Sequence, residues 1–222
     1  MFLQINNILT PDEVATIRDW MMAHDFVDGR ATAGYRAKRV KNNEQIGNDA
    51  TDRNEIDNLV LSGLRRSTDF RNLLFPARVQ RPLLSRYREG MDYGLHVDDA
   101  LMGADAQFRT DVSVTLFLSD PESYDGGELE IHSTFGIRRQ KAPAGAVLTY
   151  PSSTLHRVVP VTRGERLAAV TWVQSRVRDP ERRETLRDLD RICQKMQAVA
   201  PDSDETDLAF KTRANLLRSW AE

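Results

Sequence analysis

Hydrophobic and polar positions follow different periods along the chain, and the changes of period divide it into three parts. Up to about residue 77, two stretches on either side of a polar segment have apolar residues every three or four positions, the spacing of amphipathic helices. From about 78 to 178, short runs of β type alternate with turn residues such as those in 125–127 and 143–145. After residue 178 the helical period returns with many charges. The pattern predicts an α+β chain with a β core between helices.

The first helix is predicted in ILTPDEVATIRDWMMAH. Thr10 has the N-cap position, Pro11 the first helical position, and Glu13 completes a capping box. A second helical region is expected from about Asn54 to Leu74, after the polar and irregular residues 29–50. The apolar faces of the two regions are expected to hold Val14, Ile17 and Met21 in the first, and Ile56, Leu59, Val60 and Leu64 in the second.

The β region shows its alternation most clearly in TDVSVTLFLSD, residues 110–120. Its even positions from Val112 to Leu118 are apolar, so we expect a strand with one strongly buried face. Roughly eight short strands without helices between them predict a sandwich, a barrel or a jelly roll.

The C-terminal part predicts two helices separated by the breaker PDSD. Pro180 opens the first, and the second covers ETDLAFKTRANLLRSWA. We expect these helices to pack on the β core, with a homodimer contact through them as the alternative. The apolar stripe of the first is expected to contain Leu186, Leu189, Ile192 and Met196.

Composition narrows the functional classes. A hydrophobic content of 40% and a charged content of 29% are typical of a globular chain with a real core. The net charge of −2 provides no basic field for nucleic acid or an anionic membrane. Cys193 is the single cysteine, which excludes a disulfide framework and a cysteine-based zinc site. Without a signal peptide or a long apolar run, the expected location is the cytoplasm.

Candidate metal ligands stand in DYGLHVDDA, where His96 and Asp98 are two residues apart. Side chains at this spacing on a strand, or at its end, point to the same side. A third ligand is needed, and His156, among β-branched residues late in the β region, is the best candidate. His24 is expected at the surface, and His132 can equally be a solvated residue at a strand end.

Arg166 suggests a second component of the same site. It lies ten residues after His156, and one hairpin return would bring it alongside, on the next strand. An arginine among Leu167, Ala168 and Ala169 needs an anion, and Glu165 is the only local carboxylate. A cosubstrate with a carboxylate would supply one, because guanidinium binds carboxylate through two parallel hydrogen bonds.

Three functions fit these residues. Two histidines and one carboxylate on one face of a metal are the facial triad of non-haem iron(II) oxygenases. A jelly-roll module that binds the metal without chemistry would not need Arg166. A metal-dependent hydrolase would need a further acid or base, and Asp99 on a strand would point away from the two ligands beside it.

Several motifs resemble the 2-oxoglutarate and Fe(II)-dependent dioxygenases of the prolyl/lysyl hydroxylase type. These are HVD, DGGELEI and HRVVPVTRGER, and longer stretches such as FLSDPESYDGGELEI are similar to bacterial PKHD-type hydroxylases, over nearly the whole chain including RVKNNEQ. The resemblance implies a double-stranded β-helix (jelly roll) core at about 78–176, within a domain of residues 1–178. It also implies a C-terminal helical extension at 179–222.

The resemblance further implies roles for individual residues. His96, Asp98 and His156 would bind Fe(II), and Arg166 the distal carboxylate of 2-oxoglutarate. Tyr87 would contact this cosubstrate, and Trp172 would back the site, although core packing explains either aromatic residue equally well. The implied reaction hydroxylates a C–H bond and converts 2-oxoglutarate and O₂ to succinate and CO₂, with L-ascorbate keeping the iron reduced.

The sequence leaves the substrate and the bound metal open. A small molecule or a peptide is expected, and the candidates are a protein proline or lysine, a free amino acid, a siderophore-related molecule and, least of all, a nucleobase. The same ligands would bind Ni, Cu or Zn at least as tightly as Fe(II). The segment with Arg36, Lys38, Arg39 and Lys41 is either a solvated loop or a lid that recognises an acidic or peptide substrate.

Overall fold

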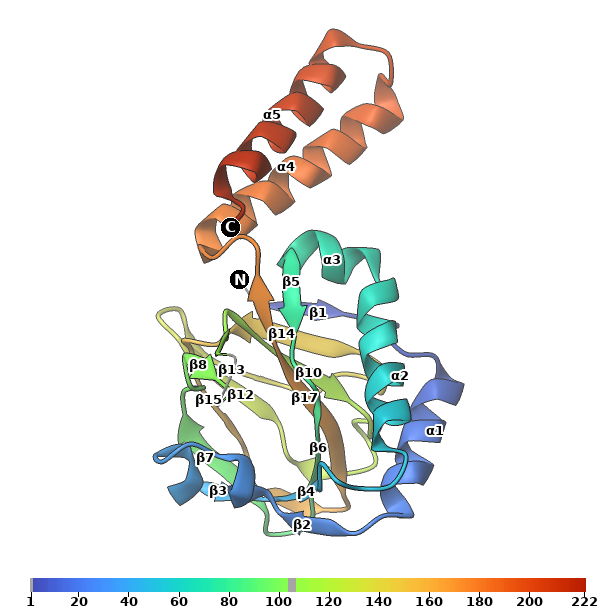
Figure 1. Cartoon of the computed structure of the whole chain (residues 1–222), viewed down its shortest axis with the longest axis vertical. Helices are drawn as coiled ribbons and strands as arrows, with labels where there is room; N and C mark the ends of the chain where they lie inside the picture. Colours follow the sequence, from blue (N-terminus) through green and yellow to red (C-terminus); the bar gives the residue numbers. More distant parts are fainter. Residues whose placement is uncertain (1, 104–106) are drawn as a thin grey trace.

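The computed structural model describes residues 2–103 and 107–222 and contains two main β-sheets with helices outside them (Figure 1). The larger, eight-stranded sheet has the order β1-β14-β10-β17-β6-β4-β2, with β5 also paired to β17. Its strands are β1 (Leu3–Ile5), β2 (Phe26–Asp28), β4 (Glu44–Ile46), β5 (Pro76–Val79), β6 (Leu83–Tyr87), β10 (Val112–Phe117), β14 (Val147–Pro151) and β17 (Arg166–Ser175).

The smaller sheet has five strands in the order β13-β12-β15-β7-β3. These are β3 (Lys41–Asn42), β7 (Asp92–His96), β12 (Leu129–Ser133), β13 (Gly136–Gln140) and β15 (Leu155–Val158). Two further pairs join β8 (Leu101–Met102) to β9 (Phe108–Arg109) and β11 (Asp125–Gly126) to β16 (Val161–Arg163). From β6 onward the chain crosses repeatedly between the two layers, and the layers enclose the site described below.

Helices cover the outer face of the larger sheet, as α1 and α2 show in Figure 1. Helix α1 (Pro11–Met22) begins with the predicted capping box between Thr10 and Glu13. The second helical region is two helices, α2 (Arg53–Arg66) and α3 (Thr68–Leu74), because extended backbone at Ser67 interrupts it. Short 3₁₀ turns η1 (Gly29–Thr32) and η2 (Ala37–Arg39) lie in the segment expected to be irregular.

The main hydrophobic core lies between these helices and the larger sheet. It joins Val14, Ile17 and Met21 of α1 to Val112, Val114 and Leu116 of β10. The prediction of a strand with one buried face was incomplete, because every residue of β10 is buried. Helices cover the apolar side of the strand, and its other side, with Ser113 and Thr115, faces the smaller sheet.

The C-terminal helices α4 (Pro180–Val199) and α5 (Asp204–Trp220) form a hairpin that extends away from the β-sheets in Figure 1. The expectation that they pack along the β core was therefore wrong. Only the base of the hairpin joins the rest, through a small cluster that includes Phe75, Val177 and Leu186. Ile192 is 49% exposed and Cys193 is buried, so the predicted stripe was also wrong at Ile192.

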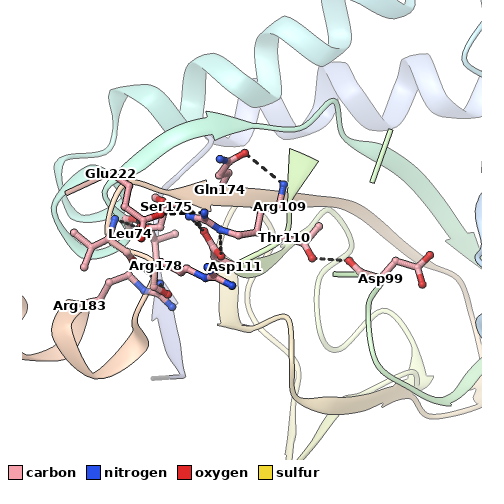
Figure 2. A network of polar contacts seen from close by, with 11 residues as sticks. Leu74, Asp99, Arg109, Thr110, Asp111, Gln174, Ser175, Arg178, Arg183 and Glu222 are labelled. Atoms are coloured by element: carbon pink, nitrogen blue, oxygen red, sulfur yellow. Dashed lines mark hydrogen bonds and ion pairs between the residues drawn. The ribbon is translucent and has the colours of Figure 1, made fainter. Parts of the chain in front are cut away.

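Polar contacts attach the base of this hairpin, as Figure 2 shows. Arg109 forms ion pairs with Asp111 at 2.8 Å and with Glu222 at 3.1 Å. Arg183 donates hydrogen bonds to the carbonyl oxygens of Val177 and Arg178. Among the described residues, the helices are too short or too polar to cross a membrane.

Candidate metal centre

His96, Asp98 and His156 come together on the inner side of the smaller sheet, with one ligand atom from each within 4.8 Å of the others. His96 ends β7 and is the register partner of His156 on β15, whereas Asp98 lies two residues beyond the end of β7. The Nε2 atoms of His96 and His156 lie 3.9 and 3.8 Å from Oδ1 of Asp98. Both separations are below twice a metal–ligand bond of about 2.1 Å, so one ion can bond Asp98 and either histidine.

Both imidazole rings are oriented by backbone carbonyl groups. Nδ1 of His96 lies 2.8 Å from the oxygen of Gly94, and Nδ1 of His156 lies 2.9 Å from that of Thr154. A carbonyl oxygen only accepts, so each Nδ1 carries the hydrogen and each Nε2 offers its lone pair to the centre. Burial, together with the nearby His156 ring, lowers the pKa of His96 to about 4, so the ring is neutral near pH 7.

Asp98 is oriented from the opposite sheet. Its Oδ2 accepts hydrogen bonds from Ser113 Oγ of β10 and from Trp172 Nε1 of β17, the latter at 2.9 Å. These donors occupy one carboxylate oxygen and leave Oδ1 directed at the two imidazoles. Trp172 was expected only behind the site. Ser113 was not singled out, although its place on the polar side of an alternating strand indicated a polar inner wall.

Glycine at position 94 allows a third segment to approach the site. A Cβ atom at Gly94 would lie 2.8 Å from Cβ of Val40, closer than side chains pack. The backbone of Val40 also accepts a hydrogen bond from the Gly94 amide at 2.8 Å. The 40s segment therefore lies against β7, and it contributes Lys41 to the interior.

A cavity of about 490 Å³ opens next to the three ligand candidates, between the two sheets. The residues that line it include Tyr87, Thr115, Tyr150, Arg166, Val170 and Trp172. Thr32, Ala33, Gly34 and Ala37 also line it, so the segment predicted to be either a solvated loop or a lid borders the cavity. Burial raises the pKa of Tyr87 to about 12, so its hydroxyl keeps its proton and remains a hydrogen-bond donor.

Arg166 is 1% exposed and projects into this cavity from the larger sheet. The predicted position, alongside His156 on the next strand, was wrong, because β15 pairs with β12 and β7 whereas β17 belongs to the other layer. Its guanidinium carbon lies 5.1 Å from the ring centre of Tyr87 and 5.2 Å from that of Phe117. Its Nε and Nη1 atoms are buried without a hydrogen-bond partner in the described part of the chain.

The remaining candidates lie elsewhere. Glu165, the local carboxylate near Arg166, faces Arg86 at 3.7 Å instead. His132 contacts Glu130 at 2.7 Å on the outer side of the smaller sheet. His24 stacks on Trp20 at the end of α1. Asp99, unlike the other three, lines the cavity, but it is exposed and does not belong to the cluster of ligand candidates.

Comparisons with known proteins identify the family of the chain. Residues 82–174 match the model of the 2OG-Fe(II) oxygenase superfamily. A PKHD-type hydroxylase of Synechococcus sp. (strain JA-2-3B'a(2-13)) is 48% identical over 223 residues, covering 100% of both chains.

Solved structures show the same fold. A prolyl-4-hydroxylase of Pseudomonas putida superposes with a TM-score of 0.55 at 22% identity, covering 79% of this chain and 92% of that one. A prolyl hydroxylase from Trichoplax adhaerens, in complex with a hypoxia-inducible-factor peptide fragment, gives 0.59 at 16% identity, covering 78% and 82%. Identity over the full length places the chain in the PKHD-type hydroxylases of the 2OG-Fe(II) oxygenase superfamily, and it is accordingly a 2-oxoglutarate-dependent dioxygenase.

Proposed function

We propose that the chain hydroxylates a small molecule or a peptide, with Fe(II) held by His96, Asp98 and His156 and 2-oxoglutarate anchored by Arg166. One observation carries the proposal: a buried arginine without a carboxylate partner in the described chain shares one cavity with a cluster of three ligand candidates. The two facing sheets support a double-stranded β-helix core at about 78–176. We also propose a domain at 1–178 and an extension at 179–222.

The donor set fits a ferrous ion. Two neutral imidazole nitrogens and one carboxylate oxygen form a facial triad and leave coordination positions for other ligands. The two imidazoles donate hydrogen bonds to the carbonyl oxygens of Gly94 and Thr154, and Asp98 accepts hydrogen bonds from Ser113 and Trp172, so the three metal-ligand side chains are fixed before any ion arrives. The centre is therefore preorganised.

Arg166 fits the distal carboxylate of 2-oxoglutarate. Leaving buried guanidinium nitrogens without acceptors is costly, and a carboxylate would satisfy two of them at once. Gly127 allows the arginine to pass close to the backbone, because a Cβ atom there would lie 3.1 Å from Cδ of Arg166. Tyr87 lies beside the guanidinium, where its protonated hydroxyl can donate to the same cosubstrate.

Iron and 2-oxoglutarate, when bound, supply an O₂-dependent oxidation in which the keto acid becomes succinate and CO₂ and the substrate gains a hydroxyl group. The residues of the chain position these partners: Arg166 orients the cosubstrate, and the carboxylate of Asp98 is held in place by Trp172. Val170 and Leu129 contribute apolar surface to the cavity wall. L-Ascorbate is the proposed external reductant, and the cytoplasm is the proposed location.

The decisive experiment compares Asp98→Ala with Asp99→Ala. The first variant loses a ligand candidate, so succinate formation from 2-oxoglutarate with Fe(II) should fall to background. The second removes the neighbouring exposed carboxylate and should keep most of the activity. Wild-type turnover in Asp98→Ala would refute the metal assignment, and loss in Asp99→Ala alone would mean that Asp99, which also lines the cavity, is required for turnover in place of Asp98.

A non-catalytic module remains distinguishable in the same assay. It would bind Zn(II) and 2-oxoglutarate, as measured by calorimetry, without forming succinate with Fe(II) under air. Self-association through α4 and α5 is a separate proposal, and it predicts a sedimentation coefficient that rises with protein concentration.

A further inference from the structure

Lys41 is a buried cation on the opposite layer from Arg166. It lies on β3, the edge strand of the smaller sheet, directly across from Tyr93 of β7. Its side chain faces the cavity, it is 6% exposed, and its Nζ lies 5.2 Å from the ring centre of Tyr93. Tyr93 in turn stacks on His96 at 3.7 Å between ring centres. The ammonium group therefore stands one aromatic ring away from the proposed metal centre.

No carboxylate of the described chain pairs with this ammonium group within 4.0 Å. The two acidic residues that influence it most are Asp98 and Asp28. Asp98 is directed at the two imidazoles, and Asp28 forms its ion pair with Arg30 at 2.5 Å. Burial consequently lowers the pKa of Lys41 to about 8, which shows that its charge is poorly compensated.

The hydrogen bonding of Lys41 is incomplete as well. Nζ donates to Thr32 Oγ1 at 3.0 Å, and Thr32 is itself joined to Gln45 at 2.6 Å. Gln45 then donates to Ser85 of the larger sheet at 3.2 Å. This series of hydrogen bonds holds the lysine in position. An ammonium group has three hydrogens, so Nζ can still donate to an acceptor in the cavity.

Charge balance indicates the nature of that acceptor. This step rests on the proposed function. A ferrous ion carries two positive charges, Asp98 and 2-oxoglutarate carry three negative charges between them, and Arg166 brings the sum to zero. Lys41 then has no directly paired counter-charge in the loaded cavity: Arg81, another lining cation, pairs with Asp57, and Asp99, the other lining carboxylate, is exposed and forms no ion pair with Lys41 in the described chain. A buried charge of this kind is costly unless a ligand neutralises it.

We propose that Lys41 is a specificity-determining residue that binds a carboxylate of the substrate, so that the hydroxylated C–H bond belongs to an anionic molecule. The carboxylate can come from a free amino acid or from an acidic peptide, and the chemistry at Nζ is the same. The lysine lies on the inner side of the segment that borders the cavity, on the far side of the Tyr93 ring from His96.

The test is a binding measurement with Zn(II) in the centre and N-oxalylglycine, an unreactive analogue of 2-oxoglutarate, filling the Arg166 site. The probes are matched pairs: free L-amino acids against their amides, and short peptides containing Asp or Glu against the same peptides with Asn or Gln. Calorimetry on the wild type should show at least about tenfold tighter binding of the anionic member in the amino acid or the peptide arm. The arm that responds identifies the source of the carboxylate.

Lys41→Met, which keeps the length of the side chain without its charge, should lose this selection. Lys38→Met, an exposed lysine of the same segment, should retain it, and Lys41→Arg should retain it in part. Binding of N-oxalylglycine should be unchanged in all three variants. Absence of selection in the wild type, or equal selection in Lys41→Met, overturns the proposal.

A second readout separates ligand binding from a structural role. Because Lys41 lacks a carboxylate partner, Lys41→Met should unfold in urea at a concentration no lower than the wild type when ligand-free. A large drop in that midpoint would make Lys41 a structural residue and overturn the proposal. Should N-oxalylglycine fail to bind the wild type, the proposed function is wrong, and the matched probes without it still decide the role of Lys41.

Discussion

Two regions of the molecule bury arginine and lysine side chains in opposite ways. At the base of the C-terminal hairpin, Arg109 has Asp111 and Glu222 as partners, and Arg183 donates to two carbonyl groups (Figure 2). In the cavity between the sheets, Arg166 and Lys41 have no carboxylate partner in the described chain. A buried charge needs a counterpart. The charged groups of the first region are therefore paired in the folded chain, whereas the cations of the second region are paired only when ligands bind.

The largest expected effect comes from removing the unpaired cation at Arg166. Truncating one partner of a buried, hydrogen-bonded charge pair costs about 2–5 kcal/mol, so Arg166→Met should raise the 2-oxoglutarate requirement by roughly 30-fold or more. The ligand-free protein should at the same time be no less stable in urea, since no partner is lost.

Arg163→Met provides the control, because that exposed arginine pairs with Asp125 at the surface and should affect neither quantity. Unchanged 2-oxoglutarate affinity in Arg166→Met would mean that another residue binds its distal carboxylate. A marked loss of ligand-free stability would mean that Arg166 stabilises the fold without a ligand, as the paired arginines of the hairpin base do.

At the base of the C-terminal hairpin, a substitution should lower stability and leave cosubstrate affinity unchanged. Asp111→Asn keeps the shape of the side chain but weakens its contacts to Arg109 and to the amide of Ser175. Breaking a buried ion pair costs about 3–5 kcal/mol, and the partial exposure of Arg109 reduces the expectation to about 2 kcal/mol. Urea unfolding should report this loss while 2-oxoglutarate affinity stays within about twofold. Asp188→Asn, in an exposed pair, should change stability by less than about 0.5 kcal/mol.

An intermediate effect is expected at Trp172, which joins the larger sheet to the metal centre. Trp172→Phe removes the donor to Oδ2 of Asp98 and keeps an aromatic ring in place. Loss of a partner that orients a ligand typically weakens metal binding about 10- to 100-fold, and we expect the lower end because Ser113 still donates to the same oxygen. Calorimetry with Zn(II) measures this, with Trp20→Phe on α1 as the matched control. Equal Zn(II) affinity in the two variants would mean that Trp172 does not help to position Asp98.

Local rules account for the parts of the molecule that the sequence predicted well. The capping box at Thr10 depends on residues three positions apart, and the inner and outer sides of β10 follow from alternation alone. His96 and Asp98 were recognisable together because two positions along extended backbone bring side chains to one side. His156 was chosen as the third ligand from its place late in the β region, the family resemblance implied the same role, and the pairing of β15 with β7 brings it to the same place.

Long-range pairing accounts for what the sequence did not predict. Arg166 was expected next to His156, but its strand joins the other layer, which no local pattern specifies. Lys41 was one of several basic residues in a polar segment, and only its register against Tyr93 distinguishes it. The hairpin of α4 and α5 has amphipathic helices, and its two helices pack on each other instead of on the β core.

The smallest expected effect concerns a third cluster, on the outer side of the smaller sheet, which resembles the paired region. Hydrogen bonds from Arg157, His132 and Arg139 lower the pKa of Glu130 to about 2. Because this folded pKa lies below the unfolded value of about 4.5, the unfolded chain binds the proton first as pH falls. The contribution of Glu130 to stability is therefore complete above about pH 4.5 and is lost as the pH falls toward about 2.

Urea midpoints between about pH 5 and about pH 3.5 reach only the first part of that loss, so the wild type should weaken modestly over this range. Glu130→Gln cannot ionise and should show a flatter pH dependence, whereas Glu122→Gln, an exposed carboxylate, should follow the wild type. Parallel curves for wild type and Glu130→Gln would mean that the paired carboxylate gives no advantage to the folded state. The hairpin base would then be the one region left to support the distinction between charges paired within the chain and cations that only a ligand neutralises.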